Sequence, residues 1–187
     1  MALYKVELTA KGLRDCEISA HHEHGVVAQI TPGEERRLYR RDRRTLVVSA
    51  QRRPIEHRAV ARVEDISSSA LARGDIVRGA LRASPTWAKP SPGGRGKVQP
   101  ILDHARQVAW LERKLASAGL AVVDLDVIGT GVVRGTKGRS TVTHNCVEAR
   151  FKAEVVDAER LAEARARGIG RGKAYGLGLL LVVPCRS

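Results

Sequence analysis

Residues 103–128, DHARQVAWLERKLASAGLAVVDLDVI, hold the clearest helix and strand signals of the chain, one directly after the other. Asp103 can cap the start of a helix, and Gly119 can end it. Between them, apolar side chains recur at the spacing of one helical face, at Val108, Leu111 and Leu115. The segment predicts a helix over 103–118 and a strand over 120–128.

The elements on either side complete a pattern. They are a strand at 76–81, a basic glycine-rich turn at 129–140, a strand at 141–156, a helix from Asp157 to Gly168, and a buried strand at 178–183. Residues 84–100, which carry four prolines and three glycines, predict a loop. The second half therefore has the order β-α-β-β-α-β, which is the ferredoxin-like pattern.

The first half is compatible with the same order, although its signals are weaker. Residues 2–9 alternate apolar and polar like a strand, and 38–40 with 45–49 predict a hairpin. Residues 15–30 predict a helix, and 55–72 a short helix or strand followed by a linker. We expect an α+β fold of two tandem ferredoxin-like, RRM-like βαββαβ domains, 1–74 and 75–187.

Composition indicates a polyanionic partner. The 187 residues include 33 Lys and Arg against 20 Asp and Glu, a net charge of +13. Such a field favours nucleic acid; the alternative is an arginine-rich proteome. The sequence contains no long basic amphipathic helix, so an anionic membrane surface is the less favoured partner. The three cysteines do not have the spacing of a zinc ribbon. The sequence also shows no signal-peptide pattern and no apolar run of 18 residues. We therefore expect a soluble cytoplasmic protein with reduced thiols.

The most specific motif is GIGRGKAYGLG, residues 168–178. Its glycines allow close backbone approach to a ligand, and Arg171 and Lys173 add charge. A Rossmann dinucleotide-binding motif is excluded because this loop follows a helix and precedes a strand. A Walker phosphate-binding motif is excluded because the pattern GxxxxGK[ST] is absent from the sequence. A purely structural turn is the alternative.

Several blocks together resemble one family. The glycine-rich loop before a terminal apolar strand is similar to the signature of the RAMP superfamily of CRISPR proteins. LYRRD with RRTLVVSAQRRP (38–54), LRASPTWAKPSPGGRGKVQP (81–100), QVAWLERKL (107–115) and EARFKAEVVDAERL (148–161) resemble CasE-type endoribonucleases, in the family's order. The resemblance implies a metal-independent ribonuclease without cofactor that binds the CRISPR repeat hairpin, cuts at its base to yield mature crRNA, and belongs to the type I-E Cascade complex.

Histidines cluster at His21, His22 and His24. Imidazole exchanges protons near neutral pH, as an RNA 2′-hydroxyl attack requires. The resemblance assigns His24 to the family's principal histidine and His21 to a position where some members carry tyrosine. Surface histidines are the alternative, and a metal site of Cys16, His21 and His24 lacks a standard spacing and a fourth ligand.

Two basic segments are candidates for RNA contact. The segment 134–139, RGTKGR, predicts a phosphate-binding arm for the RNA stem, and a solvated turn is its alternative. The segment 89–97 offers further cations. With the glycine-rich loop, the expected RNA-binding residues are Arg134, Lys137, Arg139, Gly170, Arg171, Lys173, Lys89, Arg95 and Lys97. A non-catalytic hairpin-binding subunit or an RNA-coating backbone subunit is the alternative function.

Overall fold

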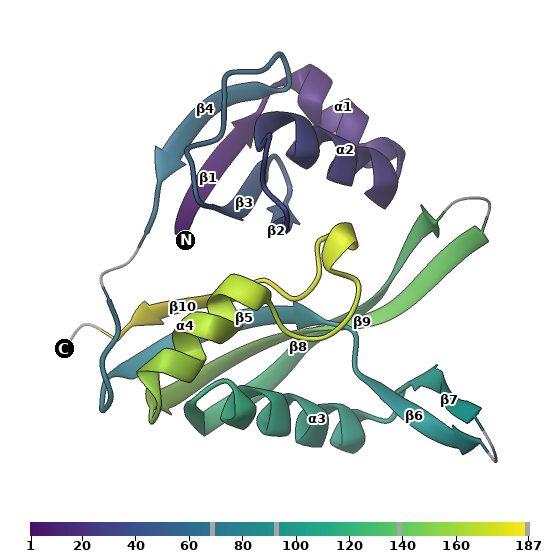
Figure 1. Ribbon diagram of the computed structural model, residues 1–187, viewed down its shortest axis with the longest axis vertical. Helices are drawn as coiled ribbons and strands as arrows, with labels where there is room; N and C mark the ends of the chain where they lie inside the picture. Colours follow the sequence, from purple (N-terminus) through teal and green to yellow (C-terminus); the bar gives the residue numbers. More distant parts are fainter. Residues whose placement is uncertain (68–69, 92–93, 138–139, 186–187) are drawn as a thin grey trace.

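The computed structural model describes residues 1–67, 70–91, 94–137 and 140–185, without the side chains of 90–95 and 137. It contains two four-stranded antiparallel sheets, stacked one above the other in Figure 1. Both follow the ferredoxin-like strand order, β2-β3-β1-β4 in the first and β10-β5-β9-β8 in the second. The expected fold class is confirmed; the boundary at residues 74 and 75 stays a prediction.

The N-terminal sheet is formed by β1 (Ala2–Leu8), β2 (Leu38–Asp42), β3 (Thr45–Ala50) and β4 (Val60–Asp65). Its helices are α1 (Ala10–Ile18) and α2 (Ala20–Ile30), where a single helix was expected. The helical conformation is interrupted at Ser19, whose extended backbone ends α1 and whose side chain caps α2. Between β3 and β4 the chain crosses without a helix, so the strand alternative for 55–72 is the correct one.

The C-terminal sheet is formed by β5 (Ile76–Ala83), β8 (Leu120–Lys137), β9 (Ser140–Val155) and β10 (Leu180–Pro184). Helices α3 (His104–Ser117) and α4 (Ala158–Arg167) cover one of its faces, with Trp110, Leu115 and Leu161 in a shared core. Asp103 and Asp157 cap these helices as expected, and Gly168 follows α4 with a φ of 69°. Between α4 and β10 lies the short 3₁₀ turn η1 (Lys173–Tyr175).

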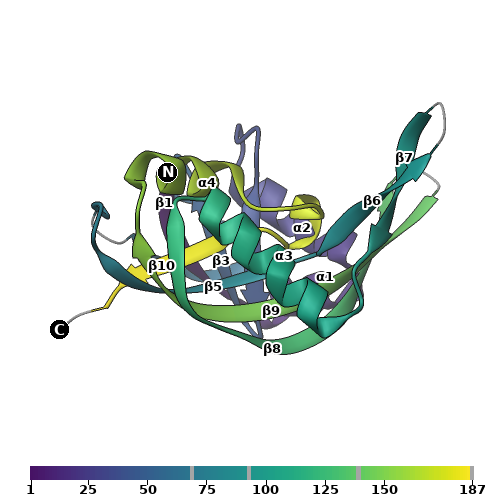
Figure 2. The same cartoon turned by 90° about the horizontal axis from the view of Figure 1, so that it is seen from below.

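Two segments expected to be irregular are β-hairpins. Residues 84–100 include β6 (Thr86–Ser91) and β7 (Gly94–Pro100), which pair with each other. Residues 129–140 are mostly the outer ends of β8 and β9, which continue in register to Lys137 and Ser140. Cross-strand pairing accommodates the glycines that suggested loops. Both hairpins extend from the same side of the molecule (Figures 1 and 2).

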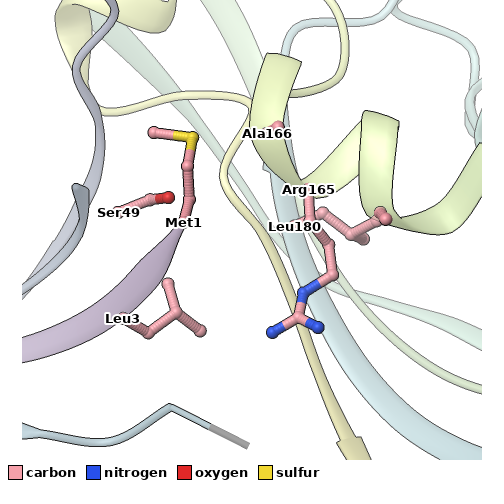
Figure 3. Close-up of a pocket in the computed structure, with 7 residues that line it drawn as sticks. Met1, Leu3, Ser49, Arg165, Ala166 and Leu180 are labelled. Carbon is pink, nitrogen blue, oxygen red and sulfur yellow. The ribbon is translucent and has the colours of Figure 1, made fainter. Parts of the chain in front are cut away.

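The two halves are joined by apolar and charged contacts. Leu3 and Leu38 of the first half form a small buried cluster with Leu179 of the second. Arg40 donates to Glu148 on β9 at 2.5 Å. A small pocket of about 110 Å³ lies at the junction. Arg165 of α4 points into it (Figure 3). These contacts fix how the N-terminal helices stand over the C-terminal sheet.

Candidate RNA-cleavage site

The histidines lie on α2, which begins at the Ser19 cap. The Ser19 hydroxyl lies 2.8 Å from Nδ1 of His22 and accepts a hydrogen bond from its backbone N–H. His21 and His22 are exposed, whereas His24 is half-buried. The three histidines therefore have different environments, and His22 contacts the cap residue Ser19.

His24 is partly enclosed by its neighbours. Its ring centroid lies 6.2 Å from that of Tyr39, and its Nδ1 is buried without a hydrogen-bond partner in the part of the chain that the structure describes. Burial lowers the His24 pKa, and the nearby charges of Arg37 and His21 lower it further. A lowered pKa keeps the imidazole neutral at neutral pH, so that it can accept a proton.

Glu23, next to His24 in sequence, has a structural role. It is buried, and Arg41 on β2 donates to it through Nε at 2.5 Å. Burial raises the Glu23 pKa, and the hydrogen bond and charge of Arg41 oppose that rise. The pair ties α2 to β2, because a buried carboxylate without a partner would be costly.

The glycine-rich loop packs directly against α2 and β2. A Cβ on Gly176 would approach both Glu23 and Tyr39 to 3.2–3.3 Å, and one on Gly172 would lie 2.7 Å from Leu177. Both residues have positive φ, 73° and 78°. Glycine is therefore needed here for backbone conformation and close packing. Gly170, an expected RNA contact, packs against Trp110.

The two cations of the loop differ in environment. Lys173 is half-buried in the turn that lies against α2, and burial together with the charge of Arg36 lowers its pKa. Arg171 is exposed and lowers the pKa of His144, although burial lowers that pKa more. Lys173 therefore lies near Arg36 in a turn that packs against α2, and Arg171 lies near His144 on β9.

The outer part of the β8–β9 hairpin carries the expected arm. Arg134 is exposed and lines a cleft of about 210 Å³ with Tyr175, Arg41 and Arg82. The side chain of Lys137 is not described, and Arg139 lies outside the described residues. The structure thus brings Arg134 to the same cleft as the start of α2.

The β6–β7 hairpin holds a second group of cations. Lys89 and Lys97 are exposed and directly opposite each other in the strand register. Like charges in that position repel, so an anionic ligand between them would be favoured. The Arg106 guanidinium lies 5.6 Å from the ring centroid of the exposed Trp87. The side chain of Arg95 is not described.

Several residues near the site were missed by the sequence analysis. These are Arg36, Arg37, Tyr39, Arg41, Arg82, His144 and Tyr175. They come from four separate segments, and although Tyr39, Arg41, Arg82 and Tyr175 lie inside the quoted family blocks, nothing local shows that these segments meet. Within the described ranges, no three His, Cys, Asp or Glu side chains form a metal-binding group, so Cys16, His21 and His24 do not converge as ligands.

The fold is that of a tandem ferredoxin-like protein, and one cleft is lined by the start of α2, by Tyr175 of the glycine-rich loop and by Arg134 of the β8–β9 hairpin. The CRISPR associated protein family matches residues 3–184, and the chain belongs to this family.

A curated relative, the CRISPR-associated endoribonuclease Cse3 of Thermus thermophilus, is 32% identical over 127 residues. That match covers 62% of this chain and 59% of the relative's length. A solved structure of Cse3 bound to a 19-nucleotide RNA superposes with a TM-score of 0.83 at 25% identity, covering 98% of this chain and all of that one.

A chain of a CRISPR RNA-guided surveillance complex has a TM-score of 0.75 at 26% identity, covering 99% of this chain and 100% of that one. These similarities confirm the expected resemblance to CasE-type proteins.

Proposed function

We propose that this protein is a metal-independent endoribonuclease that binds the CRISPR repeat RNA hairpin and cuts at its base to release mature crRNA. The observation that carries the proposal is the half-buried His24, its pKa lowered, beside the glycine-rich loop of a strongly basic chain. The relatives support it, because one is an endoribonuclease and a similar chain was solved with RNA.

In this mechanism RNA supplies its own nucleophile. The 2′-hydroxyl attacks the adjacent phosphorus, the bond to the 5′-oxygen breaks, and the products carry a 2′,3′-cyclic phosphate and a 5′-hydroxyl. A neutral His24 accepts the hydroxyl proton or, once protonated, donates one to the leaving oxygen. His21, exposed one residue after the start of α2, is the candidate helper.

The cations surround this chemistry. Arg171 and Lys173 would hold the RNA near the loop, and the arm cations at 134, 137 and 139 would hold the stem through its phosphates. Lys89, Arg95 and Lys97 are further candidates on the β6–β7 hairpin.

No described helix is long and apolar enough to cross a membrane. We further propose that the protein acts in the cytoplasm as a subunit of a type I-E Cascade complex.

A deoxy substitution tests the chemistry. Repeat RNA from the protein's own CRISPR array is incubated with protein and excess chelator, with ribose or deoxyribose at the scissile position. We expect chelator-resistant cleavage of the ribose substrate to a 5′-hydroxyl end, and binding without cleavage of the deoxy substrate. Cleavage of the deoxy RNA at the same bond would exclude this mechanism. Binding of both RNAs without cleavage of either would favour a non-catalytic hairpin-binding subunit.

A further inference from the structure

Two tyrosine hydroxyls hold the turn η1 from opposite parts of the sequence. Tyr39, on β2, donates to the carbonyl of Ala174 at 3.0 Å. Tyr175, within the turn, donates to the carbonyl of Thr136 on β8, also at 3.0 Å. Within the turn, the two residues that make these hydrogen bonds, Ala174 and Tyr175, are neighbours in sequence. One short turn is therefore fastened both to the N-terminal sheet and to the arm.

On the histidine side, Tyr39 connects the turn to His24. Its buried ring lies 6.2 Å from the His24 ring, centroid to centroid, and its hydroxyl reaches Ala174. Lys173 directly precedes Ala174, and the turn packs against α2. Burial raises the Tyr39 pKa, so the phenol keeps the proton that it donates. This hydrogen bond therefore fastens the residue after Lys173 to Tyr39, whose ring packs near that of His24.

On the other side, Tyr175 lies against the base of the arm. A Cβ on Gly135 would overlap its ring, with a nearest atom at 2.3 Å, so the ring rests directly on the β8 backbone. The His144 ring, on β9, packs 5.5 Å away, centroid to centroid. Tyr175 thus contacts both strands of the hairpin. Its contact on β8 is Gly135, the residue that directly follows Arg134.

We propose that Tyr39 is a positioning residue for RNA cleavage, acting through the turn Lys173–Tyr175, and that Tyr175 ties the same turn to the RNA-holding arm. The inference rests on the proposed function. Neither tyrosine needs to touch the reacting atoms, because both hydroxyls are engaged by backbone carbonyls. We call these two tyrosine hydrogen bonds the latch. The latch makes the placement of Lys173 relative to α2 depend on a contact between the two halves.

The first test is Tyr39→Phe, which removes one oxygen and leaves the Ala174 carbonyl without this donor. We expect the single-turnover cleavage rate at saturating protein to fall about tenfold, equivalent to about 1.4 kcal/mol. Hairpin affinity should change less than about twofold, because the phosphate contacts remain. Tyr4→Phe is the matched control, since Tyr4 is buried in the same core but on β1. Equal rates for Tyr39→Phe and the parent overturn the proposal.

A double-mutant cycle separates positioning from general structural damage. If Tyr39 acts by placing Lys173, then Tyr39→Phe should cost less than about twofold in a Lys173→Met background. Full additivity of the two losses in rate would show that Tyr39 does not act through Lys173, and would overturn the proposal.

Amide exchange tests the latch without any cleavage. The N–H groups of Tyr175 and Leu177 both donate to the Gly172 carbonyl within the loop. Tyr39→Phe should accelerate exchange at these two amides but not at Val6 in the core, which reports on folding. Unchanged exchange in the loop overturns the latch. If the parent cuts no repeat RNA, the proposed function fails, while the exchange result still decides whether the latch exists.

Discussion

His24 and Arg134 lie on the two elements that the glycine-rich loop joins, and their surroundings differ. His24 is half-buried, and burial and a neighbouring arginine lower its pKa. Arg134 is exposed on the arm, where its guanidinium is accessible to a phosphate. Burial tunes a group for proton transfer, whereas exposure suits a cation that captures a polyanion. If His24 and Arg134 have the proposed roles, we expect cleavage chemistry and RNA binding to be separable by mutation.

The largest effect on the cleavage rate is expected at the half-buried His24. His24→Ala should slow cleavage about 10²- to 10⁴-fold, the usual loss when general acid–base help is removed. Hairpin affinity should change little, because one neutral imidazole adds little beside many phosphate contacts. Single-turnover rates with protein in excess measure the chemical step without interference from product release.

An NMR titration provides an independent check on the same residue. The His24 pKa in the free protein should lie below about 6.5, the ordinary value for histidine. A value above it would remove the physical basis of the comparison. A parental cleavage rate for His24→Ala would show that another group performs the catalysis.

A smaller effect, on binding alone, is expected at the arm. Arg134→Ala combined with Arg139→Ala should weaken hairpin binding on the order of tenfold and lower the salt slope by about 2, because fewer counterions are released. The cleavage rate at saturating protein should stay near that of the parent. Binding is measured by filter retention or anisotropy across a salt series.

The control for the arm is Arg78→Ala, an exposed arginine on β5 that lines a different groove. If Arg78→Ala lowers the salt slope as much as the arm variant, the arm is not a specific stem contact. If the arm variant loses rate as severely as His24→Ala, binding and chemistry are not separable.

The smallest effects are expected at the two exposed histidines. His22→Ala should be nearly silent, because His22 contacts the Ser19 cap and fits neither position that the family resemblance assigns to a histidine or tyrosine. His21→Ala should fall between the two neighbours if His21 assists His24. Single-turnover rates of the three variants under identical conditions give this order. A crippling effect of His22→Ala would show that the alignment of α2 with the family is wrong.

Much of the C-terminal half followed from local pattern. The caps at Asp103 and Asp157 and the apolar periodicity of α3 act within a few residues, so sequence alone predicts them. The hairpins were missed for a physical reason. Prolines and glycines in 84–100 and glycines in 129–140 disfavour strands locally, yet hydrogen bonds to a partner strand override that preference.

For the site, the sequence by itself determined the ingredients: a net charge of +13, three histidines within a segment predicted to be helical, and a glycine-rich loop with two cations. Only the tertiary structure decided which histidine is buried, that Glu23 is neutralised by Arg41, and that Tyr39 reaches Ala174. The reason is that a pKa and a hydrogen bond depend on groups brought together by packing. Tyr39 and Ala174 are 135 positions apart, and no local pattern records that contact.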